Sequence, residues 1–205
     1  MKIFCISDTE ANPEQLEEWL KICKKDLNSS DRVFHLGDGI INIKKLLSKY
    51  KVTYIKGNHD SIEKNLLQER NMNINKVNLY LFHGRRKNII AEKINIYTNY
   101  VKKNLGIRPS LENYYNQLFR QYKGKYDIVL YGHMHSPRID KKQNTIFFCP
   151  GSFSPKSSIK KPTYGILEIS KNQEVKINIF TVQKNNVTPV QFYNTSFKLK
   201  VCKLF

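Results

Sequence analysis

The sequence predicts an α/β fold in which strands and helices alternate and the strands pair at least partly in parallel. Two observations support this fold class. Short apolar runs rich in β-branched residues recur along the chain, and the segments between the first of them carry apolar residues at helical spacing. A chain of 205 residues is long enough to bury a good core as one domain, so we expect a single domain over residues 1–205.

The first quarter of the chain carries the clearest alternation of strands and helices. Asn12 is placed to cap a helix, Pro13 suits its first turn, and Leu16, Leu20 and Cys23 follow at helical spacing. We expect, in order, a strand over Lys2–Ser7, a helix over Pro13–Lys25, a strand over Val33–Leu36, a short helix over Ile43–Lys49 and a strand over Val52–Lys56.

The later part of the chain adds further strands. We expect them over Val77–Phe82, Ile128–Tyr131 and Ile146–Cys149. Tyr164–Ile169 and Val175–Val182 alternate polar and apolar residues, as hairpin strands of a second sheet would. The C-terminal strands would then occupy about 164–205, with the part beyond Asn185 either an edge strand or a loose end.

At about 86–125 we expect a helical insertion, which separates the strand over Val77–Phe82 from the strand over Ile128–Tyr131. It reads as a helix over Ala91–Leu105, ended by Gly106, and a second over Ser110–Tyr122, capped by Ser110. The pair is rich in aromatic residues, namely Tyr97, Tyr100, Tyr114, Tyr115, Phe119 and Tyr122. Packing of these rings against the sheet or one another is the favoured interpretation. The alternative is a lid or a dimer surface beside the active site.

Composition limits the classes of partner and the compartment. The net charge of +18 can indicate a nucleic-acid partner. The lysines, however, are spread over the whole chain, which is also rich in Ile and Asn. This distribution favours a general compositional bias over a dedicated nucleic-acid surface as the cause of the positive charge, so nucleic acid is not the favoured partner. The four cysteines form no Cys-x-x-Cys pair, and no apolar stretch approaches the roughly 20 residues needed to cross a bilayer. We therefore expect a cytoplasmic protein without a membrane partner.

The histidines carry the functional signal, because each lies at or near the end of a predicted strand. Together with nearby acidic and amide residues they give seven candidate metal ligands: Asp8, Glu10, Asp38, Asn58, His83, His133 and His135. Singly, most of these could be cap, turn or surface residues. The pair in Gly132-His133-Met134-His135 is more specific, since two imidazoles two residues apart can reach two neighbouring ions. His35 lies inside its strand and is not expected to bind metal.

In order along the chain, Asp8-Thr9-Glu10, Gly37-Asp38, Gly57-Asn58-His59-Asp60, His83-Gly84 and Gly132-His133-Met134-His135 resemble the motifs of calcineurin-like metallophosphoesterases. Pro150-Gly151-Ser152-Phe153-Ser154 resembles the following loop of the small bacterial and archaeal phosphodiesterase branch. The resemblance covers roughly residues 1 to 170. It implies a four-layer α/β/β/α sandwich of two mixed β-sheets flanked by helices, with two metals at one end of the sheets.

The resemblance also implies roles for single residues. One metal would be held by Asp8, the residue at position 10, Asp38 and His135. The other would be held by Asp38, Asn58, His83 and His133, with Asp38 as the bridge. A hydroxide activated by the two metals would attack phosphorus in line. His59 would serve as the acid for the leaving group, and Asp60 would orient the His59 ring.

Two departures from the family pattern stand out. The family usually has Asp-x-His where this chain has Asp8-Thr9-Glu10, and a carboxylate in place of an imidazole makes the first site harder and more anionic. We therefore expect two divalent metal ions, with Mn²⁺ favoured and Fe, Ni, Mg²⁺ or Zn²⁺ as alternatives. Arg85 and Arg86 stand where many relatives have another histidine. They are either solvated loop residues or the group that binds a substrate phosphate.

The leading hypothesis is a metal-dependent phosphoesterase, acting most plausibly as a phosphodiesterase on a small phosphoester substrate. One alternative is a nuclease acting on DNA or RNA, suggested by the positive charge and the tyrosine-rich insertion. The other is a non-catalytic scaffold, as in the retromer subunit that shares this fold; that subunit lacks the acid histidine, whereas this chain keeps His59. The sequence leaves the oligomeric state open, a dimer included.

Overall fold

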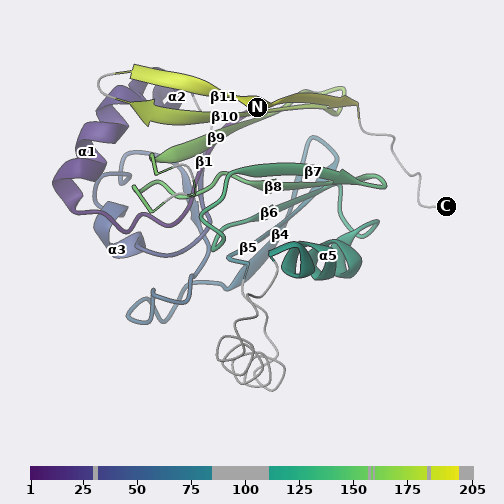
Figure 1. The fold of residues 1–205 in the computed structure, drawn as a ribbon, viewed down its shortest axis with the longest axis horizontal. Coiled ribbons are helices and arrows are strands. Elements are labelled where there is room, and N and C mark those ends of the chain that lie inside the picture. Colours follow the sequence, from purple (N-terminus) through teal and green to yellow (C-terminus); the bar gives the residue numbers. More distant parts are fainter. Residues whose placement is uncertain (30–31, 85–110, 157, 159, 184–185, 199–205) are drawn as a thin grey trace.

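Two β-sheets lie face to face in the computed structural model, with helices on the outer side of each (Figure 1). The structure describes residues 1–29, 32–84, 111–156, 158, 160–183 and 186–198. The expected helix over Ala91–Leu105, the cap at Ser110, and Arg85 and Arg86 lie outside these residues.

The first sheet has the strand order β11-β10-β9-β1-β2-β3. Its strands are β1 (Lys2–Ile6), β2 (Arg32–His35), β3 (Val52–Tyr54), β9 (Thr163–Ile169), β10 (Glu174–Gln183) and β11 (Asn186–Lys198). Strands β1, β2 and β3 run parallel, whereas β9 pairs antiparallel with β1. The expectation that the C-terminal hairpin belongs to a second sheet is therefore wrong. Strand β9 extends the sheet of β1 because an alternating strand fits either sheet, and only its pairing decides which.

The second sheet has the strand order β4-β5-β6-β8-β7. Its strands are β4 (Glu69–Ile74), β5 (Val77–Phe82), β6 (Ile128–Tyr131), β7 (Arg138–Lys142) and β8 (Thr145–Cys149). Strands β5, β6 and β8 run parallel, and β4 and β7 are antiparallel edge strands. The sequence analysis missed both edge strands, because their polar residues face solvent and give no apolar run.

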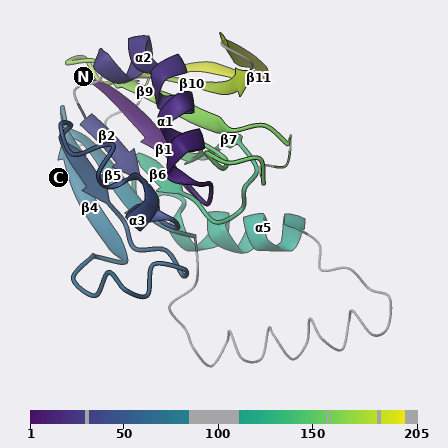
Figure 2. The same ribbon diagram turned by 90° about the vertical axis from the view of Figure 1, so that its left-hand side faces the viewer.

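Alternation along the strands builds the layers. In β1, Ile3 and Cys5 face the apolar interior between the sheets, whereas Phe4 and Ile6 face the helices on the outer side. The described helices are α1 (Pro13–Ile22), α2 (Lys24–Asn28), α3 (Ile40–Ile43) and α5 (Leu111–Tyr122). Figure 2 shows α1 and α2 against the first sheet, and Figure 1 shows α5 beneath the second. The four-layer α/β/β/α sandwich is thus confirmed.

The helices differ from the sequence prediction in their bounds. Asn12 caps α1 as expected, its side chain accepting a hydrogen bond of 2.8 Å from the Gln15 amide. The expected continuous helix over Pro13–Lys25 is interrupted at Cys23, after which α2 begins. The helix expected over Ile43–Lys49 is wrong in position. It spans Ile40–Ile43, and residues 44–49 form turns, because the loop that bears Asp38 starts the helix at Gly39.

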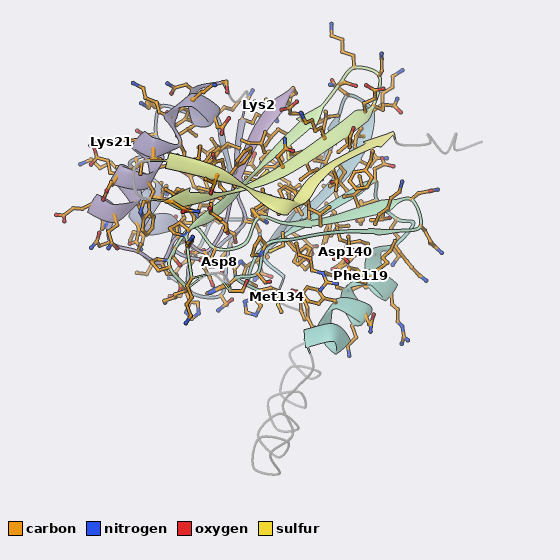
Figure 3. The ribbon with its side chains drawn as sticks, turned by 45° about the horizontal axis from the view of Figure 1, so that its top comes forward. Lys2, Asp8, Lys21, Phe119, Met134 and Asp140 are labelled. Carbon is orange, nitrogen blue, oxygen red and sulfur yellow. The ribbon has the colours of Figure 1, made fainter. Side chains whose placement is uncertain are left out.

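Helix α5 carries aromatic side chains onto the outer face of the second sheet. Tyr115 and Phe119 pack with Phe147 of β8 in one buried cluster, and Figure 3 shows Phe119 on the side of α5 that faces the sheet. The described part of the insertion therefore follows the packing interpretation. No helix among the described residues combines the length and apolarity needed to span a bilayer.

Candidate metal centre

The candidate ligands lie in loops that follow parallel strands. Asp8 follows β1, Asp38 follows β2, Asn58 follows β3, His83 follows β5 and His133 follows β6. Both sheets direct the carboxyl ends of these strands to one edge, where ligands commonly bind in open α/β sheets. Hydrogen bonds between the loops of one sheet and the loops of the other connect the two sheets at this edge.

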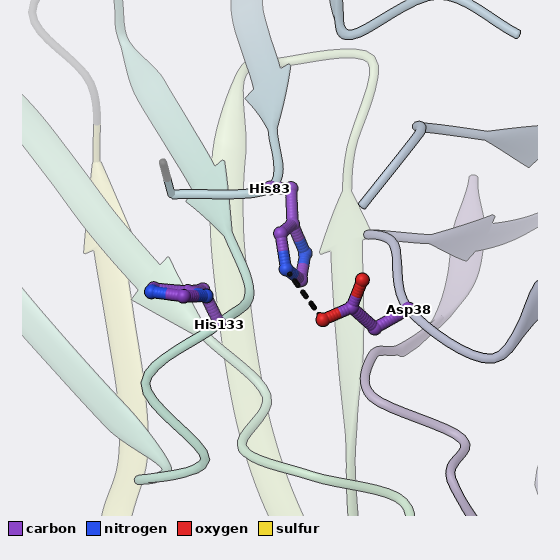
Figure 4. A group of neighbouring side chains, drawn as sticks. All are labelled: Asp38, His83 and His133. Carbon is purple, nitrogen blue, oxygen red and sulfur yellow. Dashed lines mark ion pairs between the residues drawn. The ribbon is translucent and has the colours of Figure 1, made fainter. Parts of the chain in front are cut away.

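His83 is the most firmly placed of the ligand candidates. Its Nδ1 lies 2.7 Å from the Leu36 carbonyl oxygen, to which it donates, and this bond joins the second sheet to the end of β2. Its Nε2 then points at two oxygen atoms, 3.0 Å from Asn58 Oδ1 and 3.0 Å from Asp38 Oδ2. In Figure 4 the His83 ring lies between Asp38 and His133. A backbone bond at one ring nitrogen leaves the other free to bind metal.

Asp38, His83 and His133 form an inner group. Burial and the neighbouring ionisable groups shift the pKa values of all three residues. Burial raises the pKa of Asp38, but the hydrogen bond and charge of His83, with the His59 amide, outweigh it and the net shift is downward. Burial lowers the pKa of His83, yet Asp38 and Asp8 raise it above its ordinary value overall. His133 has no such direct partner, so burial and the charge of His83 lower its pKa. The pKa values of Asp38 and His83 therefore shift in opposite directions, each because of the other group.

Asp60 holds the loops around Asp38. Its Oδ2 accepts hydrogen bonds from the Asp38 amide at 2.8 Å and the Gly57 amide at 2.9 Å, and its Oδ1 accepts one from the Ile40 amide at 3.0 Å. We expected Asp60 to orient the His59 ring; its carboxylate is instead directed at these three backbone amides. Gly57 must lack a side chain here, since a Cβ would lie 2.0 Å from Asp38 Oδ1.

Asp8 lies on the other side of the group, with His135. Its Oδ1 is buried and has no hydrogen-bond partner in the described chain, although His135 Nε2 lies 3.1 Å away. Its Oδ2 accepts from Ser7 Oγ and from the His133 amide, the latter at 3.1 Å. The Asp8 carboxylate is the largest cause of the raised pKa of His135. Two ligand atoms that face each other in this way are suited to a cation between them.

An outer group of side chains opens towards solvent. One ligand atom each from Glu10, Asp38 and His59 lies within 4.8 Å of the others. His59 Nε2 is 4.0 Å from Asp38 Oδ2, and the His59 side chain is 67% exposed. Glu10 Oε2 forms an ion pair of 2.6 Å with Lys156 Nζ. The sequence analysis missed Lys156, because nothing distinguishes it from the many other lysines until the fold brings its loop to Glu10.

Several of the ligand candidates have strained backbones. Asp8, Asp38, His133 and His135 have φ values of 54°, 61°, 69° and 51°. Residues other than glycine rarely adopt this left-handed region, and where they do the strain is often tied to function. Hydrogen bonds from the amides of three of these residues supply restraint: Asp38 to the Asp60 carboxylate, Asp8 to the Gly37 carbonyl oxygen and His133 to the Asp8 carboxylate.

His35 lies buried beneath both groups and joins their loops. Its Nδ1 accepts from the Gly37 amide at 3.3 Å, and its Nε2 donates to Thr9 Oγ1 at 2.9 Å. Thr9 Oγ1 in turn donates to the Gly39 carbonyl oxygen at 2.9 Å. Burial is the main reason that the pKa of His35 is lowered from 6.5 to about 4. A neutral His35 therefore ties the Asp8 loop to the Asp38 loop, and it presents no atom to a metal.

The donor set fits divalent metal ions. All seven candidate ligands lie in one connected cluster, in which carboxylate oxygens, an amide oxygen and imidazole nitrogens converge. The buried Asp8 Oδ1 without a hydrogen-bond partner is a further sign, because such an atom is costly unless a cation or donor reaches it. Oxygen and imidazole ligands of this kind suit Mn²⁺, Fe, Zn²⁺ and related ions.

Comparison with known proteins agrees with this geometry. The family model described as the calcineurin-like phosphoesterase superfamily domain matches residues 1–172, so the chain belongs to the calcineurin-like phosphoesterase superfamily, a family of metal-dependent phosphoesterases. The resemblance drawn from the motifs is confirmed. No curated protein matches the chain significantly.

Solved structures with the same fold include three of different origin. A predicted phosphoesterase from Streptococcus pneumoniae has 20% sequence identity and a TM-score of 0.59, with 96% of this chain and 97% of that chain covered. Wild-type Vps29 from Entamoeba histolytica, in complex with Zn²⁺, has 20% identity and a TM-score of 0.65, with 96% and 99% covered. An archaeal phosphodiesterase has 19% identity and a TM-score of 0.56, with 87% and 99% covered. At these identities the likeness shows the fold.

Proposed function

We propose that the protein is a phosphodiesterase that uses two divalent metal ions and acts on small phosphoesters. The observation that carries this proposal is the convergence of seven ligand side chains with the exposed His59 at one edge of the sandwich. The family membership supports hydrolysis of a phosphate ester, and the similar archaeal phosphodiesterase supports the diester.

The ligands would form two sets, and Asp38 would belong to both. The first would be held by Asp8, Glu10, Asp38 and His135, and the second by Asp38, Asn58, His83 and His133. Divalent ions held by these residues would supply a lowered pKa of coordinated water and neutralisation of charge on the phosphoryl oxygens. Three carboxylates among the ligands favour Mn²⁺ over Zn²⁺, because hard oxygen ligands prefer hard ions.

The chain's own residues would orient these ligands and move the proton. The His83 bond to Leu36 fixes which ring nitrogen faces the metal, and Asp60 fixes the backbone of Asp38. His59 is exposed on the outer side, and its amide donates to Asp38 Oδ1 at 2.8 Å, which fixes its backbone beside Asp38. We assign His59 as the acid that protonates the leaving oxygen. Arg85 or Arg86 would bind a phosphate oxygen of the substrate.

A metal-by-substrate activity panel on wild type and His59→Ala tests the proposal. Wild type should hydrolyse bis(4-nitrophenyl) phosphate with Mn²⁺ and lose the activity with a chelator. His59→Ala should lose about 10²–10⁴-fold, the usual contribution of a general acid. The loss should be smaller for 4-nitrophenyl than for alkyl leaving groups, since a good leaving group needs little protonation. Absence of turnover with every metal would overturn the assignment.

Two alternatives make different predictions in the same panel. The nuclease alternative rests on the net charge of +18, and nitrogen-tipped side chains project from several sides of the molecule in Figure 3. It requires tight, strongly salt-dependent binding of DNA or RNA. The scaffold alternative rests on the similarity to Vps29 and requires a folded, metal-binding protein without turnover.

A further inference from the structure

A pocket of about 360 Å³ opens beside the outer group. Its lining combines polar side chains, among them Glu10, His59 and Lys156, with the apolar Ala11, Ile41 and Ile62. The pocket therefore joins the candidate acid of the reaction to an apolar surface. The metal ligands that lie deeper, around His83, are not among its lining residues.

The apolar part of the pocket is exposed to water. Ile41 is 61% exposed and Ile62 is 78% exposed. They are two of four large hydrophobic residues that are exposed in the described chain, together with Met1 and Leu67. A single exposed hydrophobic residue needs no explanation, but two that share a pocket with a candidate acid indicate a contact with a ligand.

Ile41 and Ile62, here called the apolar wall of the pocket, lie on segments that are held by contacts within the protein. Ile41 lies on α3, whose Ile40 amide is bound by Asp60. Lys44 at the end of α3 forms an ion pair of 3.1 Å with Glu63, next to Ile62. The two isoleucines are thereby carried on segments that are joined to each other.

The position of the wall indicates which part of a substrate it meets. In a hydrolysis with His59 as acid, the leaving oxygen must come within hydrogen-bond reach of the His59 ring. The group attached to that oxygen would lie on the outer side of the site, where the pocket lined by His59 offers it space. Lys156 and Asn42 at its polar part offer hydrogen-bond donors to such a group.

We propose that this pocket is the subsite for the leaving group and that it selects an aromatic leaving alcohol through Ile41 and Ile62. The inference rests on the proposed phosphodiesterase function and adds the substrate class to it. A flat aromatic group buries both faces of its ring against aliphatic side chains at little conformational cost. A small alkyl leaving group would leave the isoleucines in water.

The test compares two diesters that differ in the size of the leaving group. Methyl 2-naphthyl phosphate and methyl phenyl phosphate release phenols of nearly equal acidity, so their chemistry is matched. Wild type should prefer the naphthyl ester about tenfold in kcat/KM, the order expected when a hydrophobic pocket buries an extra ring. The double variant Ile41→Ser/Ile62→Ser should bring the two kcat/KM values together.

Leu67→Ser is the matched control variant, because Leu67 is 58% exposed and does not line the pocket. It should keep the wild-type preference. If the double variant hydrolyses both esters and keeps the tenfold preference, the pocket is not the leaving-group subsite.

A binding measurement separates this inference from the proposed function. The dissociation constants of 2-naphthylmethylphosphonate and benzylphosphonate, which cannot be hydrolysed at a phosphate ester bond, are measured by calorimetry with Mn²⁺. Tighter binding of the naphthyl compound, lost in the double variant, supports the pocket even if no ester is turned over, and the failure then lies with the proposed function. Equal binding of both compounds to wild type would overturn the subsite.

Discussion

The two groups of metal-binding side chains differ in how completely the protein fixes them. In the inner group, Asp38, His83 and His133 are largely buried, and His83 is bonded to the backbone of the opposite sheet. In the outer group, Glu10 and His59 lie towards solvent, and the charge of Glu10 is met by Lys156. The side chains of the inner group are therefore fixed by the fold, whereas those of the outer group are less restrained by the rest of the protein.

The largest effect should come from Asp38, which belongs to both groups. Asp38→Asn keeps the shape of the side chain and tolerates its left-handed backbone. It removes the shared charge, so we expect at least about a 10³-fold loss of activity, the scale seen when a principal electrostatic group is removed from an active site. Metal content by mass spectrometry should fall at both sites. A variant that is folded by circular dichroism and still binds two metals would contradict the bridging role.

Glu10 should matter less, because it lies at the open edge. Glu10→Ala should lower activity about 10–100-fold and weaken one of the two metals, as loss of a supporting ligand does. Glu10→His should keep or raise activity and shift the preference towards Zn²⁺. Glu17→Ala, on the exposed side of α1, serves as the control. Unchanged metal content and activity in Glu10→Ala would show that Glu10 is not a ligand.

The buried His35, which lies beneath both groups, makes the stability of the protein depend on pH. His35 is buried and neutral, with a pKa lowered from 6.5 to about 4. Between these values the unfolded chain binds a proton that the folded chain does not, so stability should fall as the pH falls through this window. The contribution is on the order of 1–3 kcal/mol.

Urea unfolding with a chelator present measures this pH dependence. Wild type should lose more stability than His35→Gln between pH 6.5 and pH 4, because only the wild type carries the buried imidazole. Equal losses in the two proteins would mean that His35 does not contribute.

The smallest effect should come from Lys156. Its ion pair with Glu10 must be broken or shared when a metal binds to Glu10. Lys156→Met should therefore strengthen the binding of the metal that Glu10 helps to hold. The Lys156 side chain is 60% exposed, and pairs of this kind contribute little, so we expect a change of about two- to fivefold in the dissociation constant. Lys21→Met breaks an exposed pair on α1 and should leave metal binding unchanged. If Lys156→Met bound this metal more weakly, Lys156 would support metal binding instead of competing with it.

Much of the fold could be predicted because short apolar runs report which segments are buried. Val77–Phe82 and Ile128–Tyr131 were predicted at their observed bounds for this reason. The polar edge strands β4 and β7 could not be found in this way. The sheet to which the C-terminal hairpin belongs was likewise undetermined, since periodicity says which face is buried and not which neighbour the strand has.

For the site, the sequence by itself determined the kinds of ligand and the loops that carry them. Gly57-Asn58-His59-Asp60 and Gly132-His133-Met134-His135 are local patterns that need no knowledge of distant residues. Only the tertiary structure decided that Asp60 binds three backbone amides, that His35 joins two loops, and that Lys156 meets Glu10. Apart from the local bond between Gly57 and Asp60, these contacts join residues at least 20 positions apart, and their geometry exists only once both sheets have brought their strand ends to one edge.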